Sequence, residues 1–544
     1  MHRLIGRRTF LRAAATSLIV VRTGRGFETS TGFTHGVASG HPSADSVVLW
    51  TRFQSRSDHT QLAVEVSDSD SFAHLVARES VGALADRDHT ARITLRGLKA
   101  GSRYYFRFQA PDGRKSPIGR TGTLPTGSPE NFRIAVFSCA NLPFGWFHAY
   151  AHAAAREDLD LAVHLGDYIY EYAPGVYPSS EHAIRERVLD PAHAARSLAD
   201  YRARYANYRT DPDLLALHAR LPMIPVWDDH EFANDAWSGG AENHDPAHEG
   251  IWAVRRDAAQ RAWREWMPVP DDWTPWAAAT VGDLVTLLRL ETRITGRTEQ
   301  LTARYSALRD VSDRQSALLA FRDTVWSQST RRMLGAQQEA WLLQKLIEST
   351  RATRWQVLVQ TVPMGRLQLP DEAVRWSQNW TGRELEHIQF LDAARRAGLP
   401  ISMDNWNGYV AQRERILEAA RVAGGNLIVL SGDSHNAWAY ELQSRGGPAA
   451  VEASVQAVAS PGWESWFAQV APAEVASASV KSNPELVWAD TSRRGYLDID
   501  LRNSGAKVTW QFSTDGQRRD GGAAESFALN IKPSLHRFED RPNA

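Results

Sequence analysis

Residues 163–171, with the sequence VHLGDYIYE, join the end of an apolar strand to side chains that bind metals. The apolar run stops at Gly166, and Asp167 is followed by two phenols, Tyr168 and Tyr170. In open α/β sheets ligands bind at the carboxyl ends of strands, where such loops lie. The stretch therefore predicts a metal-binding loop after a buried strand, and its spacing alone does not choose between the two tyrosines.

Three further apolar runs also end in polar, metal-ligating residues. Residues 132–137 lead to Cys139 and Asn141, residues 223–227 lead to Asp228, Asp229, His230 and Glu231, and residues 426–430 lead to Asp433 and His435. One such loop is commonly a turn or a helix cap. Four of them in one domain predict a shared metal site at one edge of a sheet.

The chain around these loops alternates between strand-like and helix-like segments. Strands are predicted at 132–137, 159–165, 223–227, 284–290, 355–361 and 426–430, and helices at 198–208, 212–220, 251–266, 337–348 and 408–423. Pro212 separates the first two helices, because proline suits a helix start and not a helix interior. This alternation predicts a layered α/β domain.

An all-β region precedes that domain. Short β-rich runs lie at 46–50, 61–66, 90–95 and 104–108, with the spacing of a sandwich. The sequence before Tyr104 is typical of a tyrosine corner, in which the phenol bonds to the backbone upstream. We expect an immunoglobulin-like or fibronectin-like sandwich over residues 33–126 and a catalytic domain over residues 127–544, after a signal and linker at 1–32.

Composition excludes several classes of function. The 544 residues are 43% hydrophobic and 23% charged, with a formal net charge of -1, so no global field favours nucleic acid or an anionic membrane. Cys139 is the only cysteine, which excludes an intrachain disulfide framework and a zinc site made of cysteines alone. The function must therefore reside in local sites.

The N-terminus predicts export. Arg7 and Arg8 precede a short apolar stretch at 13–21, which is too short to span a bilayer and is typical of a twin-arginine signal. We expect the twin-arginine translocation machinery as a partner, no stable membrane anchor, and a periplasmic or secreted product. Arg22 and Arg25 occupy the place where a cleavage site is expected, so that site stays open.

The mixture of ligand types predicts two unlike cations. Carboxylates suit hard cations such as Ca²⁺, whereas thiolate and imidazole suit transition metals. Asp167 then lies between the two ions as a bridge, and Cys139 is a metal ligand instead of a nucleophile. Two neighbouring cations that polarise a phosphoryl group and activate water are typical of phosphoester hydrolysis.

The chain resembles the alkaline phosphatase D (PhoD-type) family of metallophosphoesterases almost from end to end. The motifs that carry the resemblance are the twin-arginine signal, FTHGVASG at 33–40, SC-x-N at 138–141, GDYIYE at 166–171, WDDHE at 227–231, ETR at 291–293 and SGDSH at 431–435. The resemblance implies an α/β/β/α-layered metallophosphoesterase domain behind a small β-sandwich. It also implies a ferric ion with calcium and an alkaline phosphatase acting on phosphomonoesters and phosphodiesters through metal-activated water.

The resemblance also implies roles for individual residues. Its iron ligands correspond to Cys139, Asp167, Tyr170 and His435, and its calcium ligands to Asp167, Asp229 and Asp433. Asp228 and Asp229 are adjacent, so either can be the ligand. His230 either contacts phosphate and protonates the leaving oxygen or only hydrogen-bonds behind the ligands, and Arg293 either reaches a phosphate or forms a structural ion pair.

Some residues depart from the family pattern, and other functions remain open. Glu291 stands where aspartate is usual, and Asn407 stands where aspartate is frequent, so the number of calcium ions is open. One alternative is a phosphodiesterase or phospholipase D-like enzyme acting on wall or lipid phosphodiesters. Another is a non-catalytic exported binding protein with a structural metal site.

Overall fold

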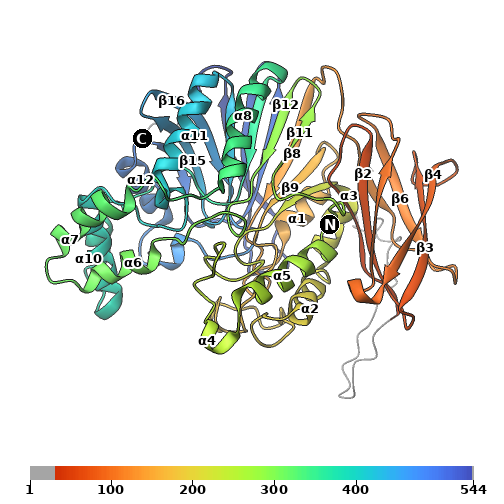
Figure 1. Cartoon of the computed structure of the whole chain (residues 1–544), viewed down its shortest axis with the longest axis horizontal. Coiled ribbons are helices and arrows are strands. Elements are labelled where there is room, and N and C mark those ends of the chain that lie inside the picture. The colour runs from red at the N-terminus through yellow and green to blue at the C-terminus, as the bar shows by residue number, and fades with distance from the viewer. Residues whose placement is uncertain (1–30, 542–544) are drawn as a thin grey trace, which may run out of the picture.

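The computed structural model describes residues 31–541, and two packed β-sheets form its centre (Figure 1). The first sheet has the order β20 (Ala523–Ile531), β19 (Ala506–Ser513), β18 (Gly495–Arg502), β8 (Asn131–Phe137), β9 (Leu161–Leu165), β10 (Met223–Val226), β1 (Gly32–Gly40), β2 (Ser46–Gln54) and β5 (Thr90–Arg96). The second has the order β11 (Ala277–Val281), β12 (Val285–Arg289), β13 (Trp355–Val359), β14 (Leu427–Ser431), β16 (Gly447–Ser454), β15 (Ala437–Ser444) and β17 (Leu486–Asp490).

Parallel strands in both sheets bring the predicted loops to one edge. Strands β8, β9 and β10 are parallel neighbours, and so are β12, β13, β14 and β16. Along β9, Leu161, Val163 and Leu165 face the core between the sheets, while Ala162 faces the opposite core. This alternation follows from the two-residue period of a strand.

Helices cover the outer face of each sheet. The first sheet carries α1 (His148–Ala154), α2 (Leu198–Tyr208), α3 (Pro212–Arg220) and α5 (Trp252–Trp266), and the second carries α8 (Ala336–Ala352), α11 (Val410–Ala423) and α12 (Pro472–Ser482) (Figure 1). The remaining helices are α4 (Pro246–Glu249) and the group α6 (Thr302–Ala307), α7 (Arg314–Phe321), α9 (Ala373–Trp376) and α10 (Gly382–Arg396), which lies to one side. The predicted α/β/β/α layering is confirmed.

Local sequence sets the break between α2 and α3. Ser197 and Asp200 form a reciprocal capping box at the start of α2. The Asp211 side chain accepts from the N–H groups of Asp213 and Leu214, and Pro212 occupies the first turn of α3. Such caps contribute about 1 kcal/mol each. The predicted boundary at Pro212 is confirmed.

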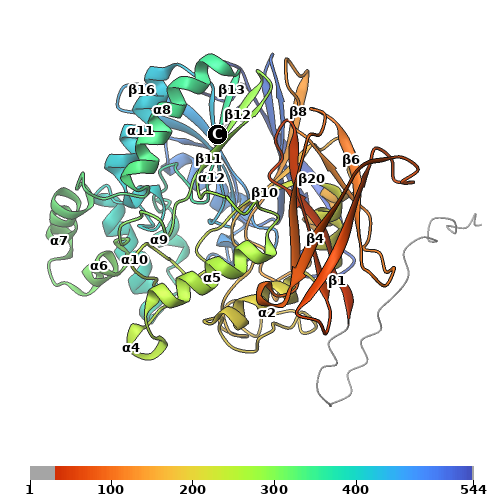
Figure 2. The ribbon, with the colours of Figure 1, turned by 45° about the vertical axis from the view of Figure 1, so that its right-hand side comes forward.

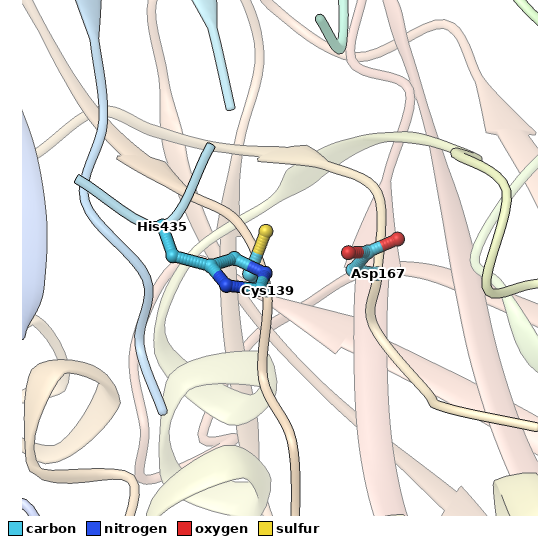
Figure 3. A group of neighbouring side chains, drawn as sticks. All are labelled: Cys139, Asp167 and His435. Carbon is cyan, nitrogen blue, oxygen red and sulfur yellow. The ribbon is translucent and has the colours of Figure 1, made fainter. Parts of the chain in front are cut away.

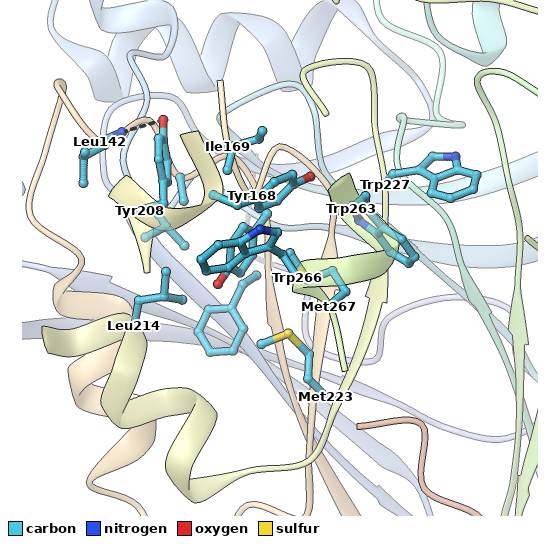
Figure 4. Packing of buried hydrophobic residues seen from close by; sticks show 14 of the residues in the cluster. Leu142, Tyr168, Ile169, Tyr208, Leu214, Met223, Trp227, Trp263, Trp266 and Met267 are labelled. Carbon is cyan, nitrogen blue, oxygen red and sulfur yellow. Dashed lines mark hydrogen bonds between the residues drawn. The ribbon is translucent and has the colours of Figure 1, made fainter. Parts of the chain in front are cut away.

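An aromatic core packs beneath the helices of the first sheet (Figure 4). The ring centroid of Trp227 lies 4.9 Å from that of Trp263 and 4.7 Å from that of Trp273. The Tyr208 hydroxyl accepts from the Leu142 N–H at 3.2 Å. Because Trp227 directly precedes the Asp228 loop, this packing fixes where that loop begins.

The N-terminal strands form the predicted sandwich. Strands β1, β2 and β5 pack against a sheet of order β4 (Leu75–Leu84), β3 (His59–Ser67), β6 (Arg103–Gln109) and β7 (Gly119–Gly122) (Figure 2). The Tyr104 hydroxyl accepts from the Lys99 N–H at 2.9 Å, so the predicted tyrosine corner is confirmed.

The sandwich is joined to the α/β layers in a way that the sequence did not predict. Gly40 of β1 pairs in parallel with Met223 of β10, so one sheet runs through both parts. A Cβ atom at Gly40 would lie 2.6 Å from the Met223 carbonyl oxygen, and this approach requires glycine. The sandwich is therefore attached directly beside the strand that leads to Asp228.

The predicted twin-arginine segment lies outside the described residues and stays a prediction. Within residues 31–541, no helix combines the length and apolar character needed to cross a membrane.

Candidate metal centre

Three predicted ligands from three loops point into one space. Figure 3 shows Cys139 after β8, Asp167 after β9 and His435 after β14 directed toward one another. One ligand atom from each lies within 4.8 Å of those of the other two. The convergence expected from the strand ends is therefore present in the geometry.

The loops hold these ligands in an unusual backbone conformation. Cys139, Asp167, Asp433 and His435 have φ angles of 59°, 51°, 62° and 62°, in the left-handed region. Residues other than glycine adopt this region at a cost of about 1–3 kcal/mol, and such strain concentrates at functional sites. Gly166 also has a positive φ, and a Cβ atom there would lie 2.4 Å from the Asp228 backbone nitrogen. The loop after β9 therefore needs glycine at position 166 to approach the loop after β10.

The structure distinguishes Tyr168 from Tyr170, which the sequence spacing alone could not do. The Tyr170 hydroxyl donates to Asp167 Oδ2 at 3.0 Å and lies 3.3 Å from His435 Nε2. The Tyr168 hydroxyl instead lies 2.9 Å from His218 Nε2, within the aromatic core of Figure 4. Only Tyr170 faces the cluster.

A backbone carbonyl orients the His435 ring, which was predicted to be a metal ligand. Its Nδ1 lies 2.7 Å from the Pro461 carbonyl oxygen, which accepts a hydrogen bond and cannot donate one. Nδ1 therefore carries the hydrogen, and the lone pair of Nε2 faces Tyr170 and the cluster.

Cys139, Asp167, Tyr170 and His435, called here the first half of the site, have donor groups that fit a cation. Within the described residues, Asp167 Oδ1 is buried without a hydrogen-bond partner. Burial raises the pKa values of the Cys139 thiol and the Tyr170 phenol well above their usual range. Both groups are neutral without a cation, and a bound metal favours their deprotonated forms. Thiolate, phenolate, imidazole and carboxylate together suit a transition metal.

The second half of the site, formed by Asp228, Asp229 and Asp433, is acidic. One oxygen from each of Asp228, Asp229 and Asp433 lies within 4.8 Å of the others, and Asp228 Oδ2 is buried without a partner among the described residues. Asp229 Oδ2 accepts from the Asp235 N–H at 2.6 Å, and Asp228 Oδ1 accepts from the Thr361 hydroxyl at 2.7 Å. Both adjacent aspartates present oxygens to the cluster, so the choice between them stays open.

Arg293 lies in the middle of these carboxylates. Its guanidinium is fully buried, pairs with Asp228 through Nε, donates to Asp404 Oδ2 at 2.6 Å and donates to Asp433 Oδ1 at 3.0 Å. These bonds favour the structural ion pair over direct contact with a phosphate. Asp404 was not predicted as part of the site, because no local pattern links it to the four loops.

The charge balance still favours added cations. Within the described chain, the carboxylates around the site outnumber the guanidinium groups of Arg293 and Arg297; the buried ones are Asp167, Glu171, Asp228, Asp229, Glu231 and Asp404, and Asp433 is partly exposed. Buried charges that lack partners cost several kcal/mol each. Carboxylate oxygens in this number fit Ca²⁺.

Glu231 organises the two central loops. Its carboxylate accepts from the N–H groups of Asp167 at 3.0 Å, Tyr168 at 2.6 Å and Asp228 at 2.7 Å. Burial raises the pKa of Glu231 to about 8. The sequence placed this residue in a motif but gave no sign of its role, because the three amides come from two strands that are distant in sequence.

His230 faces the cluster, and its ring is held by Glu171. Its Nδ1 lies 2.8 Å from Glu171 Oε2, and its ring stacks on Tyr170 with centroids 4.3 Å apart. Burial lowers the pKa of His230, but the negative charges of Asp229 and Asp167 outweigh it, so the pKa is raised well above the usual range. These charges favour the protonated form of His230, which lies beside Asp167 and Asp229.

The departures from the family pattern have structural explanations. Glu291 accepts from the N–H groups of Arg293 and Ile294, each at 2.8 Å, and so holds the turn that carries Arg293. The Asn407 side chain donates to the Gly365 carbonyl at 3.0 Å and to Asn405 Oδ1 at 2.8 Å. Asn407 thus stabilises a loop, and Asp404 is the residue of that loop that contacts the acidic cluster through Arg293.

Known proteins are similar to this chain in sequence and in fold. The sequence model of the PhoD-like phosphatase family matches residues 134–510, and that of its N-terminal domain matches residues 22–125. Alkaline phosphatase D of Bacillus subtilis (strain 168) is 31% identical over 429 residues, which are 75% of this chain and 65% of that protein. A solved structure of PhoD is similar with a TM-score of 0.77 and 26% identity, covering 95% of this chain and 94% of that one. The chain thus spans less than two thirds of the length of this curated relative from Bacillus subtilis. The family model at residues 134–510 includes all four loops of the site.

Proposed function

The chain belongs to the PhoD-like phosphatase family of phosphoric ester hydrolases, and we propose that it is an exported, metal-dependent alkaline phosphatase acting on phosphomonoesters and phosphodiesters. The observation that carries the proposal is the sharing of Asp167 between two ligand sets of different chemistry. One set contains a thiol and an imidazole, and the other contains only carboxylates and His230.

The donor chemistry supports a specific division of metals. Cys139, Asp167, Tyr170 and His435 would hold Fe³⁺, and Asp167, Asp229 and Asp433 would hold Ca²⁺, with Asp228 as the alternative to Asp229. When bound, such a pair supplies Lewis acidity that polarises the phosphoryl group and lowers the pKa of water.

The chain's own residues position the ester and move its protons. Glu171 accepts from His230 Nδ1 and fixes the ring, and the nearby carboxylates favour the protonated form of His230. We assign His230 as the acid that protonates the leaving oxygen. Arg293 is a positioning residue, because its bonds to Asp228, Asp404 and Asp433 hold the carboxylates apart at fixed places.

The surrounding hydroxyl groups support direct attack by water. Ser138 Oγ lies 3.0 Å from Cys139 Sγ, Thr361 donates to Asp228, and Ser460 Oγ lies 2.9 Å from the Tyr170 hydroxyl. Each is engaged with a proposed ligand, and none has a histidine base within reach in these bonds. Hydrolysis without a covalent phosphoenzyme inverts the configuration at phosphorus.

The same proposal includes location and domain division. Arg7 and Arg8 support export by the twin-arginine route to the periplasm or the exterior. We propose a sandwich domain at 33–126 and a catalytic domain at 127–544.

The experiment that tests this function is turnover by the purified full chain. We expect hydrolysis of p-nitrophenyl phosphate and of bis(p-nitrophenyl) phosphate at alkaline pH, with loss of both activities on chelation. The ratio of the two rates distinguishes a general phosphatase from a phosphodiesterase. A chiral phosphate ester should be hydrolysed with inversion, and retention or the absence of hydrolysis by metal-loaded protein would contradict the proposal.

A further inference from the structure

We propose that Tyr172 and Tyr177, called here the aromatic wall, select substrates whose alcohol group carries a flat ring, by stacking on that ring. This inference rests on the proposed function, because it concerns the leaving group of the same reaction. Both tyrosines are partly exposed and adjoin the small buried cluster that contains Cys139 and Tyr170. The wall is therefore next to the centre and still accessible to a ligand.

The wall adjoins His230 at one end and His435 at the other. The Tyr172 ring centroid lies 5.2 Å from that of His230, and the Tyr177 centroid lies 6.3 Å from that of His435, with an interplanar angle of 24°. The two tyrosine rings are 5.6 Å apart at 57°. Together they border the space between the proposed proton donor and a proposed metal ligand.

The place of His230 determines which part of a substrate meets the wall. An alcohol group that extends from the centre past His230 lies against Tyr172, whose ring centroid is 5.2 Å from that of His230. Tyr172 is the aromatic ring beside His230 on its exposed side, since Tyr170, which also stacks on His230, is buried. A ring on the alcohol would therefore meet the wall, whereas a short aliphatic alcohol would not reach across it.

Hydrogen bonds from the metal-site loops hold the wall in place before a ligand binds. The Tyr172 hydroxyl donates to Asn234 Oδ1 at 2.9 Å, and the Asn141 side chain donates to the Tyr177 carbonyl at 3.3 Å. A turn between the tyrosines is closed by the Val176 N–H and the Ala173 carbonyl at 3.2 Å. This gives a role to Asn141, which the sequence placed in a motif with Cys139. Rings that are already ordered lose little entropy when a ligand stacks on them.

The test compares a ring-bearing ester with a ring-free ester in matched variants. In wild-type protein, Tyr172→Leu, Tyr172→Phe, Tyr177→Leu and Tyr177→Phe, kcat/KM is measured for phenyl phosphate and for glycerol phosphate. Each leucine variant should lower the phenyl-to-glycerol ratio by about fivefold. Tyr177→Phe should keep the ratio, because stacking needs the ring and not the hydroxyl, and Tyr172→Phe, which also loses the hydrogen bond to Asn234, should lower it by less than Tyr172→Leu does. Tyr105→Leu, on β6 of the sandwich, is the control for a lost tyrosine far from the site.

Binding without turnover provides a second readout. Calorimetry with phenylphosphonate and methylphosphonate should show that the leucine variants weaken the first by about fivefold and leave the second unchanged. Equal losses of kcat/KM on both esters and of affinity for both phosphonates would contradict the proposed role of the aromatic wall. They would not contradict the proposed function. If the wild-type protein hydrolyses neither ester, the proposed function fails, and the phosphonate comparison still decides whether the wall recognises a ring.

Discussion

The two halves of the metal centre solve the problem of buried charge in different ways. Burial raises the pKa values of Cys139 and Tyr170 and so favours their neutral forms. A bound cation would favour their deprotonated, anionic forms. The acidic half already contains a cation, because Arg293 pairs with Asp228 and Asp433. Burial also raises the pKa values of Asp228 and Asp433, so the halves differ in that the second is partly neutralised by a cation of the chain itself.

The largest effect is expected from the residue that the halves share. Asp167→Asn removes the charge that both ligand sets use, so kcat should fall by more than about 100-fold, the upper end of the losses seen when only an outer partner of a ligand is removed. Kinetics with p-nitrophenyl phosphate and metal content per chain check this prediction. A variant that keeps both ions and more than a tenth of the activity would show that Asp167 is not a bridge.

Arg293→Ala tests whether the Arg293 guanidinium neutralises part of the charge of the acidic half. Removing one partner of a buried ion pair costs about 3–5 kcal/mol, because Asp228 and Asp433 lose their counter-charge, while Asp404 keeps Arg297. We expect a lower Tm in the presence of chelator, and added Ca²⁺ should restore more of the Tm in this variant than in the wild type. Equal calcium responses in the two proteins would place the calcium site elsewhere.

Tyr170→Phe tests the metal dependence of the other half. A phenolate or thiolate bound to Fe³⁺ should give a visible charge-transfer band, and loss of the phenol should shift or abolish it, with about a tenfold drop in kcat. Tyr168→Phe is the matched control, because its hydroxyl faces His218. A band that responds to Tyr168 and not to Tyr170 would reverse the assignment.

The smallest effect is expected far from both halves. Tyr104→Phe removes the hydrogen bond from the Lys99 N–H in the tyrosine corner, which should cost about 1 kcal/mol of stability. Chemical unfolding measures the loss, and kcat should not change. A loss of activity without a loss of stability would link the sandwich to catalysis.

The sequence predicted the features that arise from short-range patterns. The apolar runs before Cys139, Asp167, Asp228 and Asp433 became parallel strands, because alternating burial and the position of Gly166 are local properties. The start of α3 at Pro212 followed from the fixed φ angle of proline.

Features that depend on distant contacts were missed. Asp404 enters the site through Arg293, from which it is separated by 111 residues, and Glu231 binds amides of a loop 63 and 64 residues away. The pairing of Gly40 with Met223 likewise depends on two segments meeting in space. No local period encodes such contacts, so only the folded chain reveals them.

The most direct test of the central claim is anomalous diffraction from crystals of the full chain, recorded on both sides of the iron absorption edge. Two unlike ions that share Asp167 predict an iron signal between Cys139 and His435, and a neighbouring peak at Asp229 and Asp433 that does not change across the edge. Identical signals at both positions, or an iron-free and fully active protein, would contradict the division of the site into two unlike halves.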